Sequence, residues 1–308
     1  MNRKHEPTLC FPDAEKSCFA CCPPIRTAGY EHIQYKNIIK RILRENTRAF
    51  AGRKQGISPI TGYSCWALGY LDKEYRLVGC LLHPSRNKGE ELRYRIDYGE
   101  KCKRESCIES KIFMTLSIKE RKFWLHLTDG FDSFSYSSAT INPLFHIMGW
   151  GPSLLRLIAM NEDMNSFSKE FFFCKYIFFH TSLNPRANAY LINQILKKNN
   201  LHLLKSESFL RKFEVFSERL SEQISKAAHQ TYDAPYTHLL DLDHLFLNFL
   251  RLSAGLVKIN KDEACRLKDI VDKDIQQFKK TIRDEDEIIS PGRPALYPQI
   301  ETTEVKCL

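Results

Sequence analysis

Cysteine is the residue type whose number and spacing in this chain point to chemistry. Eight of the eleven cysteines lie within the first 107 of 308 residues. They are Cys10, Cys18, Cys21, Cys22, Cys65, Cys80, Cys102 and Cys107. Cysteine thiolates are the usual ligands of structural zinc and of iron–sulfur clusters. We therefore predict that the first third of the chain gathers thiolates around a metal.

Three short spacings within this third are typical of chelating pairs. Cys18–Cys21 is a C-x₂-C pair, in which two intervening residues let the chain turn and present both sulfur atoms to one ion. Cys80–His83 supplies a C-x₂-H chelate, and Cys102–Cys107 supplies a looser one. Cys65 and Cys10 add single thiols. One such pair is common in any cysteine-rich chain, whereas three of them in so short a stretch indicate a metal site.

Several residues have a second interpretation. Cys22 is either a ligand of some metal or a buried thiol, because adjacent cysteines rarely reach the same ion. His83, which Pro84 follows, is either a ligand or a loop histidine with satisfied hydrogen bonds. Cys10 is isolated and could be a spare thiol, yet eight thiolates divide naturally into two four-coordinate sites. Cys174 follows three phenylalanines, which favours a buried apolar thiol over a ligand.

Positive charge accompanies the cysteines. Residues 1–107 hold 20 Lys and Arg against 12 Asp and Glu, a balance of +8 out of the +9 of the whole chain. Lysine and arginine near a thiolate site would lower cysteine pKa values and offset the negative charge of the site. A basic surface for nucleic acid is the competing interpretation. No basic and aromatic residues interleave in a known RNA-binding motif, so nucleic-acid binding is the less favoured of the two.

The N-terminal residues and the apolar runs bear on the compartment. Positive charge at the start of the chain is not followed by the apolar stretch of a secretory signal. The richest apolar run, residues 171–179, is far shorter than the roughly 20 residues needed to cross a bilayer. We expect a cytoplasmic protein, in which dense cysteines serve metal binding or catalysis more often than disulfides.

The segments that must position the cysteines differ in pattern. Residues 1–27 have no helical period, so we expect a loop anchored by the metal. Apolar residues then recur at helical intervals from Gly29 to about Phe50, which predicts an amphipathic helix. Residues 57–107 carry closely spaced glycines, which predict tight turns and one small hairpin through Tyr75–Leu82.

Beyond Cys107 the pattern favours helices. Candidate helices are Ser117–Thr128, Pro143–Met160, Ser166–Phe179, Pro185–Lys198, Lys205–His229, Tyr236–Val257 and Lys261–Arg283. We predict a mainly α protein, with an irregular cysteine-rich metal-binding module over residues 1–107. An all-helical domain, packed as a bundle or irregular array, follows over residues 108–289. Residues 290–308 are expected to form an extended C-terminal tail.

The helical part contains one candidate carboxylate site. Asp241, Asp243 and His244 form a D-x-D-H pattern, but leucines interleave with them, which favours a helical turn with outward charges. The chain has no P-loop, G-x-G-x-x-G, G-x-S-x-G or H-E-x-x-H motif. The sequence therefore assigns no reaction and leaves open whether the protein is an enzyme.

The cysteine pattern resembles that of a known family. Its elements are Cys18-x₂-Cys21-Cys22, Cys65, Leu71-Asp72, Gly79-Cys80, His83-Pro84, Cys102 and Cys107. In this order they are similar to the cysteine-cluster family often called YkgJ-like, described as zinc- or iron-chelating and sometimes as Fe–S oxidoreductases. The resemblance spans about residues 10–107 and implies chelation by the matched cysteines. This chain has a longer insert at residues 23–64, and His83-Pro84 where many relatives have Arg-Pro.

Three functions follow as hypotheses. The first is a metal-binding protein whose helical domain binds a protein or small-molecule partner. The second is an Fe–S oxidoreductase or group-transfer enzyme, and the third is a basic nucleic-acid binder. The metal is zinc or an iron–sulfur cluster. His83 beside Cys80 favours zinc, the surplus of cysteines favours iron–sulfur, and a pair of zinc ions sharing thiolates would also use eight cysteines.

Overall fold

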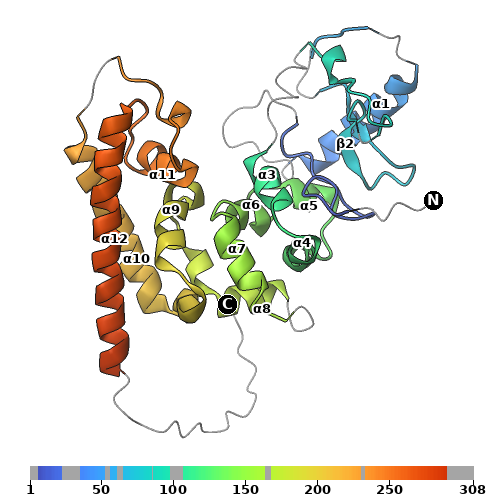
Figure 1. Ribbon diagram of the computed structural model, residues 1–308. Helices are drawn as coiled ribbons and strands as arrows, with labels where there is room; N and C mark the ends of the chain where they lie inside the picture. The colour runs from blue at the N-terminus through green and yellow to red at the C-terminus, as the bar shows by residue number, and fades with distance from the viewer. Residues whose placement is uncertain are drawn as a thin grey trace, which may run out of the picture. The chain divides into compact units, whose positions relative to one another are not determined.

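The structure is a computed structural model that describes residues 6–22, 35–52, 56–60, 65–84, 86–97, 107–163, 168–229 and 233–289. The chain divides into two compact units, Met1–Lys169 and Glu170–Leu308, and is mainly helical, as predicted (Figure 1). The predicted tail over residues 290–308 lies outside the described residues, as does the predicted start of the first helix. No helix in the described ranges has the length and apolar character needed to cross a membrane.

The first unit combines a two-stranded sheet with short helices. Its elements are α1 (Lys36–Ala51), β1 (Leu68–Tyr70), β2 (Val78–Cys80), η1 (Arg93–Arg95), α3 (Ile108–Met114), α4 (Ile118–Leu125), η2 (His126–Thr128), α5 (Ser133–Ser137), α6 (Pro143–Met148) and α7 (Pro152–Ala159). The prediction of one helix over Pro143–Met160 is wrong, because Gly151 between α6 and α7 has φ +90° and breaks it.

The hairpin is displaced from its predicted place. β1 and β2 pair antiparallel, with Leu68 opposite Cys80 and Gly69 opposite Gly79. The predicted range Tyr75–Leu82 contains β2, but its partner strand lies upstream. Gly69 lies in strand β1 and not in a turn. The strand needs a residue without a side chain here because α1 passes close to it. A Cβ atom at this position would lie 2.7 Å from the Thr47 Oγ1.

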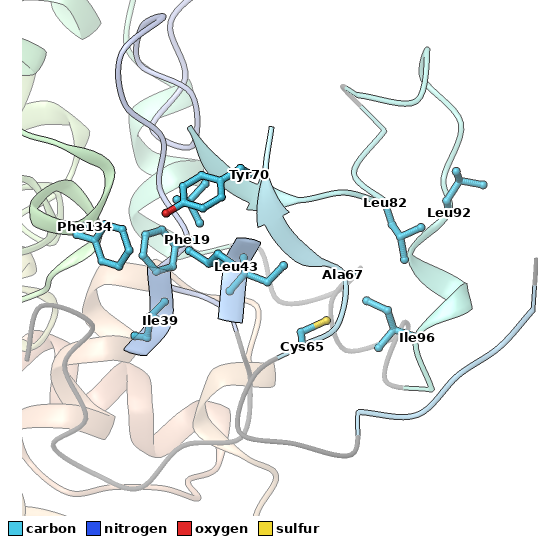
Figure 2. Close-up of a cluster of buried hydrophobic side chains, with 12 residues drawn as sticks. Phe19, Ile39, Leu43, Cys65, Ala67, Tyr70, Leu82, Leu92, Ile96 and Phe134 are labelled. Atoms are coloured by element: carbon cyan, nitrogen blue, oxygen red, sulfur yellow. The ribbon is translucent and has the colours of Figure 1, made fainter. Parts of the chain in front are cut away.

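One hydrophobic cluster of the first unit lies between α1, the hairpin and α5. Ile39 and Leu43 on α1 are buried against the sheet together with Phe19 from the N-terminal loop (Figure 2). Phe134 of α5 completes this cluster, and its ring meets that of Phe19 edge to face at 5.3 Å between centroids. The cysteine-rich segments thus share a core with a helix that follows residue 107. The first compact unit consequently extends past the predicted boundary, to Lys169.

All the named secondary-structure elements in the described residues of the second unit are helical. Its elements are α8 (Lys169–Lys175, beginning at the boundary), η4 (Ile177–His180), α9 (Pro185–Ile195), η5 (Lys198–Lys205), α10 (Glu207–Ala227), η6 (Thr237–Leu239), α11 (His244–Asn248), η7 (Phe249–Ser253) and α12 (Lys261–Ile289). Phe216 of α10 stacks on Phe278 of α12 at 4.2 Å between ring centroids. The predicted helix over Tyr236–Val257 is three short helical segments, because residues 240–243 between η6 and α11 are extended or bent.

Candidate functional site

One cavity of the first unit is lined by cysteines from distant parts of the sequence. The cavity measures about 260 Å³. Its lining includes Cys10, Cys18, Cys21, Cys22, Cys65, Cys80 and Cys107, together with His83. These are eight of the nine residues that the sequence analysis selected. The ninth, Cys102, lies outside the described residues.

Backbone hydrogen bonds fold the first cysteine-bearing loop back on itself. The Cys18 N–H donates to the Cys10 carbonyl oxygen over 2.9 Å, which places these two residues side by side. The Cys22 N–H donates to the Phe19 carbonyl oxygen over 2.9 Å and closes a tight turn. Phe19 itself is buried in the core (Figure 2). The turn around Cys21 is therefore anchored by an apolar side chain and not by the thiols alone.

The hairpin supplies the next thiols. Cys65 leads into β1 through a turn in which the Leu68 N–H donates to the Cys65 carbonyl oxygen over 2.9 Å. Cys80 ends β2, and the His83 N–H donates to its carbonyl oxygen over 3.1 Å. Since Leu68 pairs with Cys80, the sheet brings both turns to the same end of the hairpin. The C-x₂-H segment thus forms a turn of the kind that a chelate requires.

Helix α3 contributes Cys107 and a buried carboxyl group. Cys107 precedes the helix, and its thiol donates to Glu109 Oε2 over 2.8 Å. The Glu109 side chain is buried although it is an acidic residue. Ser110 follows Cys107 by three positions, and its Oγ lies 3.8 Å from the Cys10 Sγ. The start of α3 therefore meets the first cysteine of the chain.

Three residues of α5, which the sequence analysis did not select, hold the cysteine loop in place. The Ser17 N–H donates to the Ser133 Oγ over 3.1 Å, and the Phe19 N–H donates to the Ser137 Oγ over 2.9 Å. The Tyr136 hydroxyl donates to the Leu9 carbonyl oxygen over 3.0 Å. Their signal in the sequence is the alternation of serine with aromatic residues in Ser133–Ser137.

Burial favours the neutral form of the thiols of Cys10, Cys18 and Cys107 by raising their pKa values. It is the main cause of the raised pKa values of Cys10 and Cys18. Cys107 has a pKa of about 12, raised first by burial and then by Glu109. The pKa of Cys22 is raised most by its hydrogen bond with Cys21, whose Sγ lies 4.0 Å from the Cys22 Sγ. A cation placed among these thiols would act in the opposite direction and favour thiolates.

His83 and Arg93 provide the nitrogen groups of the cavity. Burial, followed by the positive charge of Arg93, lowers the pKa of His83 and favours the neutral imidazole that can bind a metal. Arg93 donates from Nε to Glu91 Oε1 over 2.8 Å and from Nη2 to Oε2 over 2.5 Å. This bidentate pair lowers the pKa of Glu91 to about 2. The Arg93 guanidinium is thereby fixed where it can offset negative charge on thiolates.

The thiols surround the cavity without converging on one point. Within the described ranges, no three or more His, Cys, Asp or Glu side chains are arranged so that they could hold a metal ion. None of the seven described cysteines of the cavity forms a disulfide bond. Cys21 is exposed, so the cavity is open to solvent at that thiol. The arrangement brings potential ligands together, and closure on a metal would need side-chain movement.

The other residues considered in the sequence analysis lie outside this cavity. Cys174 on α8 is exposed, so the prediction that it is buried is wrong. Cys265 is exposed on α12. Asp243 caps α11 by accepting hydrogen bonds from the N–H groups of Leu245 and Phe246, which agrees with a structural role for the D-x-D-H segment. No protein-family model, curated protein or solved structure matches the chain.

Proposed function

We propose that the first unit is a metal-binding module whose ligands are the cysteines of the cavity, with His83 as a further candidate. The observation that carries this proposal is the meeting of seven thiols from three separated stretches of chain around one space of about 260 Å³. The stretches are residues 10–22, residues 65–83 and Cys107. A hydrophobic core alone would not need sulfur at every one of these positions.

The chemistry of the lining suits a cationic centre with thiolate ligands. Thiolates must form before they can bind a metal, and metal binding releases their protons. The fixed guanidinium of Arg93 would stabilise the resulting negative charge, and the exposed Cys21 marks a path of entry. Zinc bound here would hold the loops together, whereas an iron–sulfur cluster would add electron transfer. The family resemblance of the sequence is consistent with either metal.

The residues that the structure describes give less support to nucleic-acid binding. Several basic residues of α1 are engaged within the first unit. Lys36 forms an ion pair with Asp132. Both Lys36 and Lys40 lie over the Phe134 ring. Arg44 lies over the Tyr75 ring. These contacts give the positive charge of α1 a role in packing, so metal binding is the function that the geometry supports best.

The test is metal analysis of the full-length protein purified without oxygen. We expect bound zinc, or iron with acid-labile sulfide and the visible absorption of an iron–sulfur cluster. Cys80→Ser should lose metal, whereas Cys265→Ser, which removes an exposed thiol from α12 in the second unit, should retain all of it. Folded wild-type protein that stays metal-free after incubation with zinc, and after anaerobic reconstitution with iron and sulfide, would overturn the proposal.

A further inference from the structure

A second cavity adjoins the first and is lined by only part of the cysteine set. It measures about 300 Å³, and its lining includes Cys10, Cys18, Cys21 and Cys107. These four thiols therefore lie between two spaces. By contrast, Cys22, Cys65, Cys80 and His83 are found in the lining of the first cavity and not of the second. The geometry thus separates the candidate ligands into two sets of four.

The electrostatic neighbours of the thiols follow the same division. The thiol of Cys18 is influenced by Cys10, Cys21 and Cys107, which together form the first set. The thiol of Cys22 is influenced by Cys65 and Cys80 of the second set, and also by Cys21. Cys21 thus belongs to the first set and touches the second. Cys21 lies next to the second set because it is adjacent in sequence to Cys22.

The two sets meet at these adjacent cysteines. The Cys21 Sγ and Cys22 Sγ lie 4.0 Å apart. Two thiolates on one tetrahedral ion with bonds of about 2.3 Å are separated by about 3.8 Å, so these sulfur atoms lie about as close as two ligands of one ion, and centres on either side of them could share a thiolate. Eight ligands also exceed what one four-coordinate centre can use. A single ion or cluster would leave four of these groups without a role in binding.

We propose that the cavity holds two adjoining metal centres, one bound by Cys10, Cys18, Cys21 and Cys107 and the other by Cys22, Cys65, Cys80 and His83. This inference rests on the proposed function and deepens it. The first centre has four thiolates, and the second has three thiolates and one imidazole, a set that is typical of zinc. The Cys21 thiolate lies where it could be shared between the two.

The stoichiometry of the full-length protein tests the division. Wild-type protein, loaded with zinc alone or reconstituted with iron and sulfide, should hold two centres per chain. Cys18→Ser or Cys107→Ser should each remove the first centre and leave about half of the metal. Cys65→Ser or Cys80→Ser should do the same for the second centre. Combining Cys18→Ser with Cys107→Ser should cost no more metal than either alone, whereas combining Cys18→Ser with Cys65→Ser should remove all of it.

Failure of this inference and failure of the proposed function give different results. One centre per wild-type chain would overturn the two-centre assignment and leave metal binding intact. Variants of one set that keep the full wild-type content would exclude that set as a centre. Folded wild-type protein without metal would overturn both proposals. If a serine variant fails to fold, the wild-type stoichiometry still decides, and Cys265→Ser reports any loss caused by handling alone.

Discussion

The Ser17 hydroxyl exchanges two hydrogen bonds with the backbone of Val78. It donates to the Val78 carbonyl oxygen and accepts from the Val78 N–H, each over 2.7 Å. Ser17 precedes Cys18, and Val78 lies two residues before Cys80, so one buried side chain joins two cysteine-bearing segments. Ser133 of α5 extends the connection by accepting from the Ser17 N–H. The relative placement of thiols from distant segments thus depends on a serine.

Replacing this serine should loosen the site. Ser17→Ala would leave the buried N–H and carbonyl of Val78 without this partner, at a cost of about 1–3 kcal/mol of unfolding free energy. Trp66, Trp124 and Trp150 all lie in the first unit, so urea unfolding followed by tryptophan fluorescence measures the loss. Ser153→Ala on α7, at an exposed position of the same unit, is the control. Equal midpoints for the two variants would refute the anchoring role.

The α1 core contact gives a second prediction. Leu43 is fully buried, and Leu43→Ala should destabilise the first unit by about 2–5 kcal/mol, because it removes packed methyl groups and leaves a cavity. Ile38 is on the same helix but is 54% exposed, so Ile38→Ala should change stability by no more than about 0.5 kcal/mol. The same fluorescence-detected urea titration compares them. A similar loss in both variants would contradict the orientation of α1.

The close approach of α1 to β1 gives a third prediction. A Cβ at Gly69 would lie 2.7 Å from the Thr47 Oγ1 and 2.9 Å from a Leu81 methyl carbon. The Thr47 hydroxyl cannot easily move, because it donates to the Leu43 carbonyl oxygen and accepts from the Tyr70 N–H. Gly69→Ala should therefore cost about 1–3 kcal/mol.

The matched control for this change is Gly52→Ala at the end of α1. Gly52 has φ −98°, and among the described residues no heavy atom outside its own stretch of chain lies within 4 Å of the position of its Cβ. Alanine there should be neutral or stabilise by up to about 1 kcal/mol through the unfolded state. Thermal unfolding of both variants gives the comparison, and a Gly69→Ala protein as stable as Gly52→Ala would show that helix and strand have room between them.

A fourth prediction concerns pH and the second unit. Glu263 accepts from the His229 N–H over 2.8 Å and from Arg266 Nη2 over 2.7 Å. Its hydrogen bond with Arg266 is the main cause that lowers its pKa to about 2. Because the folded-state pKa is depressed, the stabilisation is present above the ordinary glutamate pKa and is lost as pH falls toward 2.

Glu263→Gln should therefore lower the urea midpoint at neutral pH, with a difference from wild type that shrinks between about pH 5 and pH 2. Circular dichroism of the helices is the measurement. Glu222→Gln is the control, because Glu222 pairs with Lys226 at 3.4 Å between largely exposed side chains, and such pairs contribute little. A pH-independent effect of Glu263→Gln would argue against a contribution from the charged carboxylate.

The sequence was informative where a signal is local. Helical periodicity located α1, α10 and α12, and the residues chosen for their ligand spacing line one cavity wherever they are described. Turn formation at Cys80–His83 also follows from short-range spacing. These features depend on residues only a few positions apart, which is the range over which a pattern can be recognised without knowing the fold.

The sequence was misleading where the cause is a distant contact. Gly69 looked like a turn residue, but its role is to admit Thr47 of α1. Phe171–Phe173 suggested that Cys174 is buried, yet α8 buries Phe172 and exposes Cys174. The serines of α5 carried no ligand chemistry, so their hydrogen bonds to the cysteine loop became visible only in three dimensions. Metal identity and number stay predictions for the experiments above.

The residues of α5 that hydrogen-bond to the cysteine loop are synthesised after the cysteines. Every proposed ligand precedes residue 108, whereas Ser133, Tyr136 and Ser137 follow it by at least 25 positions. A nascent chain emerges from its N-terminus onward, so all the thiols leave the ribosome before the helix that fixes their loop. For that interval the cysteine loop lacks the hydrogen bonds that α5 supplies, so the cavity can be completed only after residue 137 has been made.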